Sequence, residues 1–169
     1  MKAQTPDKKR FAPGLPEELA NLTTFLLKRV AYAAKERTME AYEELGLHPY
    51  HYAILLVLDD GSHETQGSIA DALGYDRGQL VGLLDELEEH NLVERRRDPD
   101  DRRRHIVQTT PEGARMLRRL RTVARRNEDA FLEPLDDVQR ADLLDLLQRL
   151  AEKHEPVCAP FAPPGETPS

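Results

Sequence analysis

Residues 64–97, ETQGSIADALGYDRGQLVGLLDELEEHNLVERRR, contain the pattern that decides the fold. Thr65 is placed to cap a short helix that ends at Gly74. Asp76 is placed to cap a second helix, and Gln79 follows it at the spacing of a capping box. Leucines then recur at helical spacing, at Leu80, Leu83, Leu84 and Leu87. Two short helices joined by a tight turn that contains glycine predict a helix-turn-helix.

The residues that follow predict a β-hairpin. Residues 92–97 have the composition of a strand, the segment 98–101 (DPDD) is typical of a turn, and residues 105–109 predict the returning strand. A hairpin directly after a helix-turn-helix predicts a winged helix, with the hairpin as the wing.

Helical patterns flank the winged helix on both sides. Apolar residues recur every three or four positions from Pro16, which predicts one long helix to about residue 44 that ends at Gly46. The other predicted helices are one after His48 that stops near residues 59–61, one from Pro111 to at least Phe131, and one over residues 138–151.

These elements predict a mainly α fold, a winged helix-turn-helix with a small β-hairpin wing and helical regions at both chain ends. Polar residues and prolines at the two termini predict flexible segments. The expected parts are an N-terminal extension (1–14), an N-terminal helical region (15–47), the winged helix-turn-helix (48–110), a C-terminal helical region (111–153) and a proline-rich tail (154–169).

Composition favours a cytoplasmic protein without a membrane span. The chain of 169 residues is 39% hydrophobic, and no stretch approaches the ~20 apolar residues of a membrane helix. Basic residues near the N-terminus are not followed by the apolar run of a secretory signal. Cys158 is the single cysteine, so no internal disulfide can form and the expected compartment is the reducing cytoplasm.

The net charge of −7 argues against nucleic acid, but the distribution of charge matters more than the sum. Residues 59–91 contain nine acids and one arginine, and residues 127–155 contain nine acids and three bases. Residues 93–110 contain six arginines, and residues 115–126 contain six arginines and no acid. A run of charged residues usually forms a solvated surface. Binding to a polyanion would require the two arginine-rich segments to lie on one surface.

Residue types found in enzyme sites occur here without the spacing that chemistry requires. Six histidines are present, but there is no H-E-x-x-H motif, glycine-rich phosphate loop or nucleophile elbow. His154 and Cys158 are four residues apart, but Pro156 between them prevents a shared helix face. We therefore expect no enzyme, no metal site and no cofactor.

Residues 84–113, LDELEEHNLVERRRDPDDRRRHIVQTTPEG, resemble the wing region of the MarR family of bacterial transcription regulators. The shared pattern is a leucine–glutamate helix end, L-V-x-R, D-P-x-D-R-R and T-x-x-G, and the order of elements matches over residues 16–153. The resemblance implies a homodimer, with dimerisation helices in residues 15–47 and 111–153. It also implies a repressor that binds double-stranded DNA at a pseudo-palindromic operator.

The chain departs from the family in the recognition helix, the second helix of the helix-turn-helix. Gly78, Val81 and Gly82 stand where many relatives carry hydroxyl or basic residues. Glycines remove potential base contacts and cost helix stability, about 1 kcal/mol each relative to alanine. Together with the net charge, they support an alternative function, a winged-helix module that binds a ligand or protein without reading DNA. The arginines of the wing argue against that alternative.

The wing is expected to contact DNA through arginine, because narrow A·T tracts concentrate negative potential in the minor groove. The alternative is a solvated cluster of mutually paired charges. The candidate contacts to groove or phosphate are Arg95, Arg97, Arg102 and Arg103. Asp98 and Asp101 are expected to support the wing by holding a guanidinium through paired hydrogen bonds.

The helix-turn-helix is expected to read the major groove with the start of its recognition helix. Arg77 suits either guanine or a phosphate, Gln79 suits adenine, and Val81 suits the thymine methyl group. The candidates at the start of the preceding helix are Thr65, Gln66 and Ser68. These three residues are expected either to bind a phosphate or simply to cap their helix.

Two further groups leave alternatives open. The resemblance implies an effector pocket near the helix after His48, where polar aromatic residues would bind a small aromatic or phenolic effector; ordinary packing is the alternative. The residues concerned are Tyr42, His48, His51 and Tyr52. The arginines of residues 115–126 predict a solvated or acid-paired face, with acids of the last helix as partners across a dimer, or a phosphate contact near Arg115.

Overall fold

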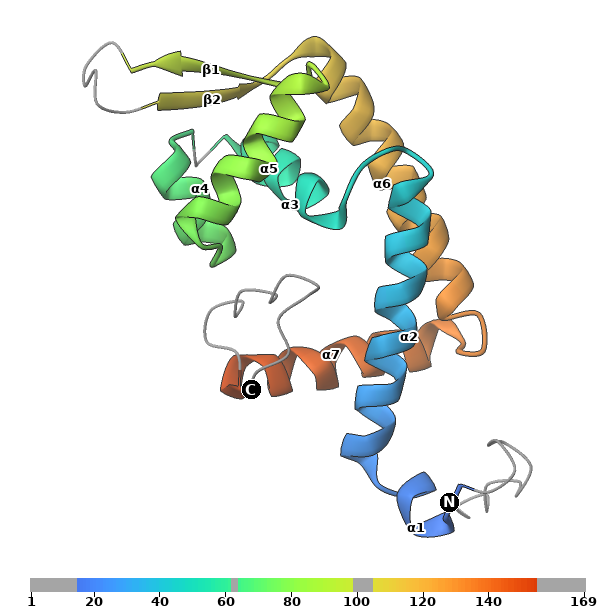
Figure 1. The fold of residues 1–169 in the computed structure, drawn as a ribbon. Coiled ribbons are helices and arrows are strands. Elements are labelled where there is room, and N and C mark those ends of the chain that lie inside the picture. Colours follow the sequence, from blue (N-terminus) through green and yellow to red (C-terminus); the bar gives the residue numbers. More distant parts are fainter. Residues whose placement is uncertain (1–14, 62–63, 99–104, 155–169) are drawn as a thin grey trace. The chain divides into compact units, whose positions relative to one another are not determined.

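The computed structural model describes residues 15–61, 64–98 and 105–154 (Figure 1). Within them, residues 15–37 and 38–154 belong to two compact units. The elements are α1 (Glu17–Ala20), α2 (Thr23–Glu43), α3 (Pro49–Asp60), α4 (Gln66–Leu73), α5 (Arg77–Glu89), β1 (Val93–Arg97), β2 (His105–Thr109), α6 (Pro111–Phe131) and α7 (Asp137–His154). The predicted winged helix and its mainly α class are confirmed.

The prediction of one unbroken N-terminal helix was wrong. α1 ends at Ala20, and Asn21 takes the C-cap position with φ −98° and ψ 0°. Helical hydrogen bonding resumes where the Leu26 N–H donates to the carbonyl of Leu22. Asn21 and the two threonines that open α2 have lower helix propensity than the residues around them, and asparagine competes for backbone hydrogen bonds. Apolar periodicity continues through such a break and therefore does not reveal it.

Helix caps agree closely with the sequence prediction. Thr65 caps α4 in a reciprocal capping box with Ser68, and the Asp76 carboxylate accepts hydrogen bonds from the backbone N–H groups of Gly78 and Gln79. A second reciprocal box joins His48 and His51 at the start of α3. At Asp76, the side chain of Gln79 does not complete the box among the described residues. The glycines expected to end helices adopt the left-handed conformation: Gly46, Gly61 and Gly74.

The hairpin is antiparallel, with Val93 opposite Thr109 and Arg97 opposite His105. It is tied to the helix-turn-helix because the Val107 N–H donates to the Glu64 carbonyl at 2.7 Å. The first strand starts one residue later than predicted, because the Leu92 N–H closes the end of α5 on the Leu87 carbonyl.

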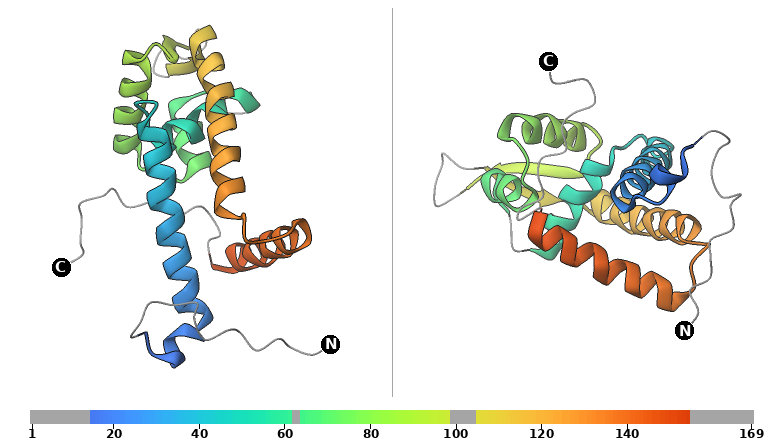
Figure 2. Two further views of the ribbon diagram at one scale, coloured as in Figure 1. Left: turned by 90° about the vertical axis from the view of Figure 1, so that its right-hand side faces the viewer. Right: turned by 90° about the horizontal axis from the view of Figure 1, so that it is seen from below.

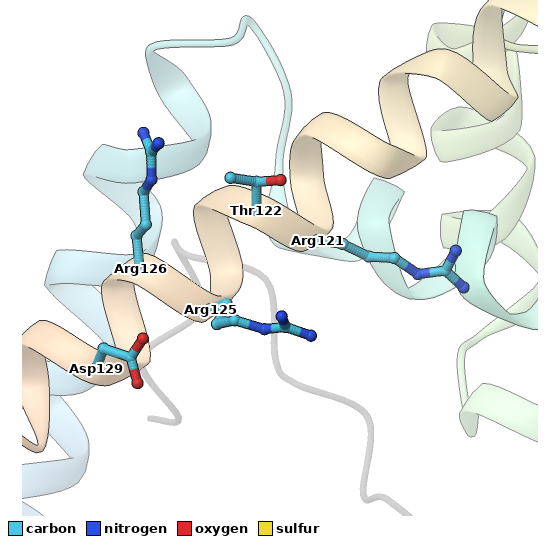
Figure 3. A pocket seen from close by; sticks show the side chains of 5 residues that line it. All are labelled: Arg121, Thr122, Arg125, Arg126 and Asp129. Carbon is cyan, nitrogen blue, oxygen red and sulfur yellow. The ribbon is translucent and has the colours of Figure 1, made fainter.

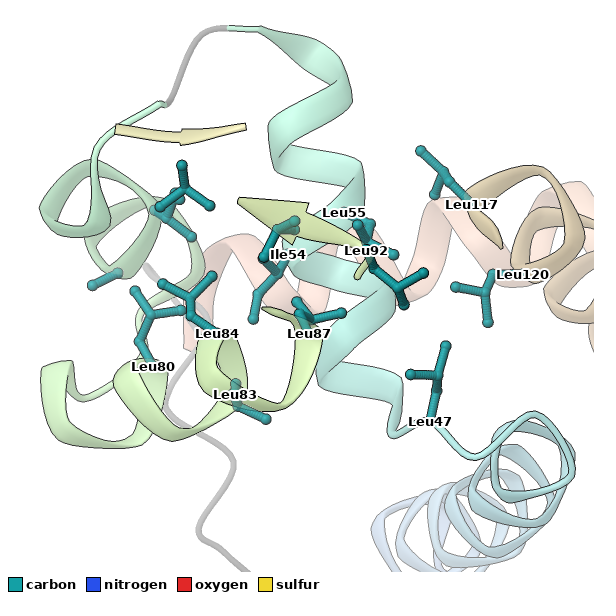
Figure 4. Close-up of a cluster of buried hydrophobic side chains, with 14 of the residues drawn as sticks. Leu47, Ile54, Leu55, Leu80, Leu83, Leu84, Leu87, Leu92, Leu117 and Leu120 are labelled. Atoms are coloured by element: carbon teal, nitrogen blue, oxygen red, sulfur yellow. The ribbon is translucent and has the colours of Figure 1, made fainter. Parts of the chain in front are cut away.

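The hydrophobic core lies among α3, α5, the hairpin and the first half of α6 (Figure 4). All four leucines predicted on the recognition helix, α5, are buried. Figure 2 shows α3 close to both α5 and α6, in agreement with their contacts. The fully buried side chains around them include Ile54, Leu55, Ile69, Leu92, Val107, Leu117 and Leu120.

The wing base and α6 meet at unusually close range. The Thr110 hydroxyl donates to the Asn91 carbonyl at 2.6 Å and accepts from the Gly113 N–H at 3.0 Å. The Thr110 N–H donates to the Leu92 carbonyl at 3.0 Å. A Cβ atom on Gly113 would lie only 2.0 Å from the Leu92 carbonyl oxygen, so this position has room for glycine alone. The T-x-x-G motif is thereby explained as a hydroxyl cap followed by a backbone contact.

The last helix, α7, has no buried residue. Its exposed apolar side chains are Val138, Leu144, Leu146, Leu147 and Leu150. Among the described residues, no helix is both long enough and apolar enough to cross a membrane.

Candidate nucleic-acid interface

The start of α5 presents a smooth, exposed surface. Arg77, Gly78, Val81 and Gly82 are exposed, whereas Gln79 is half-buried. A Cβ on Gly82 would meet no atom within 4 Å, so packing inside the chain does not require this glycine. Glycines on an exposed helix face let another molecule approach the backbone closely. The surface therefore suits close contact by a groove more than a dense set of side-chain contacts.

The start of α4 uses its hydroxyl groups internally. The Ser68 N–H donates to Thr65 Oγ1 at 3.1 Å, and the Thr65 N–H donates to Ser68 Oγ at 3.1 Å. The capping role expected as the alternative is thus present for both residues. Gln66, the first residue of α4, is half-buried.

Arg95 points from the wing onto α5. Its guanidinium lies 2.6 Å from the Asp85 carboxylate and 2.5 Å from that of Glu88, and its side chain is only 22% exposed. The Arg95 backbone N–H also donates to Glu88 at 3.2 Å. These hydrogen bonds from Arg95 lower the pKa of Glu88. Two acids of the recognition helix therefore neutralise an arginine of the wing.

The other arginines of β1 face outward. Arg96 is exposed and pairs with Glu94 at 2.7 Å, while Arg97 is exposed at the strand end. Asp98 is half-buried directly after it. Arg102, Arg103 and Asp101 lie outside the described residues.

The residues expected near an effector form two local pairs. Tyr42 is buried and its ring centroid lies 5.7 Å from that of Tyr52. Burial, with a smaller contribution from Tyr52, raises the pKa of Tyr42 to about 12. His48 and His51 belong to the capping box of α3. Packing and capping thus account for all four positions, and an effector contact there stays a prediction.

His51 also connects α3 to the recognition helix, which the sequence did not indicate. Its Nδ1 accepts a hydrogen bond from the His48 N–H at 3.1 Å, so the neutral ring carries its proton on Nε2. Nε2 lies 3.0 Å from Glu86 Oε2 but has no aligned hydrogen-bond partner among the described residues. Burial, aided by His48 and His90, lowers the pKa of His51 to about 4.

This buried histidine predicts that acid weakens the fold. Its pKa in the unfolded chain is 6.5, so between pH 6.5 and 4 the unfolded state binds the extra proton. The free energy of unfolding should fall over that range by up to about 3 kcal/mol. Urea unfolding of the wild type and a His51→Gln variant at several pH values measures this slope. The variant should lose most of it and an exposed His105→Gln variant should keep it; equal slopes in all three proteins would contradict the assignment.

Two arginines of α6 pair with acids inside the chain, in agreement with the expected acid-paired face. Arg121 pairs with Asp59 of α3 at 2.6 Å, and Arg115 pairs with Glu112 on its own helix. Pairing with acids of α7 across a dimer is untested. No cluster of three or more potential metal ligands occurs within residues 15–61, 64–98 and 105–154.

Comparison with known proteins places this architecture among transcription regulators. A family model described as MarR family matches residues 45–104. The putative transcriptional regulatory protein for the hcr operon of Thauera aromatica is 33% identical over 120 residues, which are 71% of each chain.

Two solved structures are also similar. The transcriptional repressor CouR bound to a 23-mer DNA duplex is 35% identical, with a TM-score of 0.72 over 80% of this chain and 96% of that chain. CouR from Rhodococcus jostii RHA1 bound to p-coumaroyl-CoA is 28% identical, with a TM-score of 0.66 and the same coverage.

Proposed function

The chain belongs to the MarR family and is a DNA-binding transcription regulator, and we propose that it acts as a homodimeric repressor. The observation that carries this proposal is the joint arrangement of recognition helix and wing. The exposed start of α5 faces outward, while Arg95 holds the wing against the far end of the same helix. A wing that is held in place beside an exposed recognition helix is suited to DNA binding, with the helix in a major groove and the wing in the adjacent minor groove.

The proposed DNA contacts combine exposed residues of α5 and β1 with candidates that the sequence suggests. Arg77 and Val81 would enter the major groove, with Gln79 beside them. The backbone N–H groups at the start of α4, around Gln66, would bind a phosphate. The remaining proposed contacts are Arg97, Arg102 and Arg103, supported by Asp98 and Asp101. We propose that Arg95 holds the wing against α5 and does not contact DNA.

A homodimer would cover the exposed apolar side chains at both chain ends. In the N-terminal unit these include Leu19, Leu22, Leu27 and Val30, and in α7 they include Leu144 and Leu147. Exposed apolar side chains that gather on one helix are typical of an interaction site. A two-fold dimer would place its recognition helices on half-sites about one DNA turn, ~34 Å, apart.

The effector class we propose is an aromatic acid or its coenzyme A thioester. The structure of the similar regulator CouR with p-coumaroyl-CoA supports this class. The two pairs, Tyr42 with Tyr52 and His48 with His51, are the proposed contacts for the aromatic end. No catalytic role is assigned, because the family is one of transcription regulators.

The test is binding of the purified full-length protein to DNA upstream of its own gene, measured at several salt concentrations. Saturable binding that weakens steeply with salt supports the proposal, because phosphate contacts set the salt dependence. If that DNA does not bind, selection from random sequences follows. A selection that enriches no site would favour the alternative of a winged-helix module that does not read DNA.

An Arg77→Ala variant separates base reading from phosphate binding. Loss of a bidentate guanine contact should cost about 1–3 kcal/mol and relax the preference at one operator position. Loss of a phosphate contact should weaken binding to all sequences equally and reduce the salt slope by about one. We expect the first result, because Arg77 is exposed at the first position of α5. Affinity and preference measured on single-base operator variants decide between them; wild-type behaviour in both would remove Arg77 from the interface.

A further inference from the structure

A pocket of about 260 Å³ on α6 has no role in the functions discussed above (Figure 3). Its lining residues are Arg121, Thr122, Arg125, Arg126 and Asp129. Arg121 and Arg125 lie four positions apart, as do Thr122 and Arg126, the spacing at which side chains on a helix become neighbours. In Figure 3, Arg121 and Arg125 extend to the same side of α6, and Arg126 leaves the helix on an adjacent side. Three of the five lining residues are arginines.

The charges of the pocket are only partly balanced within the chain. Arg121 pairs with Asp59 at 2.6 Å, and the Asp129 carboxylate lies 3.4 Å from the guanidinium of Arg140. Arg125 and Arg126 have no ion-pair partner in the part of the chain that the structure describes. The Asp129 carboxylate thus pairs with an arginine outside the pocket. Arg125 and Arg126 remain available to bind an anion.

The position of the pocket argues against DNA as its occupant. α6 begins at the wing base, where the Thr110 N–H bonds to the Leu92 carbonyl. At 1.5 Å per residue, Arg121 lies about 15 Å along the helix from Pro111, and Asp129 lies about 27 Å from it. The basic residues of the pocket therefore lie about 15 Å or more along α6 from the wing base.

The link to Asp59 instead connects the pocket to α3. That helix carries Asp59 near its end, and His51 and Tyr52 of the proposed effector site in its first turn. A coenzyme A thioester has its acyl group and its phosphates at opposite ends of a long flexible arm. The pocket is small compared with the 300–1,000 Å³ typical of whole-ligand sites, so it suits one end of such a ligand.

We propose that the Arg121, Arg125 and Arg126 pocket binds the phosphate groups of a coenzyme A thioester effector. This inference rests on the proposed function, whose effector class it narrows to the thioester. Arginine forms paired, charge-assisted hydrogen bonds with phosphate, and three guanidinium groups on neighbouring turns match a ligand with several phosphates. A free aromatic acid, which has no phosphate, would not use this pocket.

The experiment is calorimetric titration of the full-length protein with coenzyme A itself. The test variant is R125Q/R126Q, and the matched control is R118Q/R119Q, which removes the same charge from exposed positions of the same helix outside the pocket. The test variant should bind coenzyme A at least about tenfold more weakly, because each lost hydrogen bond between an arginine and a phosphate reduces the affinity. The control should change affinity by less than about threefold, because exposed charges at a distance are screened by salt.

Several results would overturn the inference. These are no binding of coenzyme A to the wild type at millimolar concentration, equal weakening in both variants, or equal affinity of the wild type for inorganic pyrophosphate. Operator DNA affinity in the absence of effector should be the same in R125Q/R126Q and the control; a selective loss in the former would make the pocket a DNA contact. Circular dichroism checks folding, and R125Q alone replaces the double variant if needed. A wild type that binds operator but not coenzyme A would leave the proposed repressor standing.

Discussion

Replacement of Gly113 by alanine is expected to lower the free energy of unfolding by at least about 3 kcal/mol. The new Cβ would lie 2.0 Å from the Leu92 carbonyl oxygen and 2.8 Å from Cγ2 of Thr109. Both neighbours belong to the wing base and have little freedom to move, because Leu92 is buried and its carbonyl accepts the Thr110 N–H. The start of α6 would have to separate from the hairpin. Urea unfolding at neutral pH measures the loss.

Two other glycines provide controls for this prediction. A Cβ on Gly67 or Gly82 would meet no atom within 4 Å. Alanine should therefore be tolerated at both, and Gly82→Ala should raise the free energy of unfolding by up to about 1 kcal/mol through helix propensity. A Gly113→Ala protein as stable as the wild type would show that α6 does not pack directly on Leu92. An equal loss of unfolding free energy in all three variants would show that the effect comes from replacing a glycine at any position.

A double variant of the wing, Arg102→Ala with Arg103→Ala, is expected to weaken operator binding by about 100-fold or more. Each arginine that contacts the backbone or minor groove contributes on the order of 1–3 kcal/mol, and each phosphate contact adds about 0.9 to the salt slope. The difference in operator affinity between the wild type and the variant should therefore shrink as salt rises. The wild type makes more phosphate contacts, so its affinity falls more steeply with salt. Fluorescence anisotropy of labelled operator between low and physiological salt measures both quantities.

The control for the wing variant is Arg118→Ala with Arg119→Ala, which removes the same formal charge from the exposed face of α6. It should reduce affinity far less, since charges beyond a Debye length of about 10 Å at 0.1 M salt are largely screened. Equal effects of the two double variants would show that net charge, rather than the wing, sets the affinity. Wild-type affinity in the wing variant would favour the winged-helix module that does not read DNA.

Most of the secondary structure was predictable from local sequence. Thr65, Asp76 and Gly74 were assigned their cap positions correctly, because a cap depends on groups within one helical turn. The second strand and the long helix after it have the predicted bounds, His105–Thr109 and Pro111–Phe131. The break at Asn21 was not predicted, because a small difference in propensity there does not disturb the apolar spacing.

The sequence by itself therefore determined the order of elements, their caps, and the leucines that form the core. The tertiary structure alone decided the roles of chemically similar charged residues. Arg95 and Arg97 are equivalent in the sequence, yet only Arg95 meets Asp85 and Glu88 on α5. The contacts of His51 with Glu86 and of Gly113 with Leu92 also join residues far apart in the chain. Local patterns act within a few residues, whereas burial and ion pairing depend on which distant elements the fold brings together.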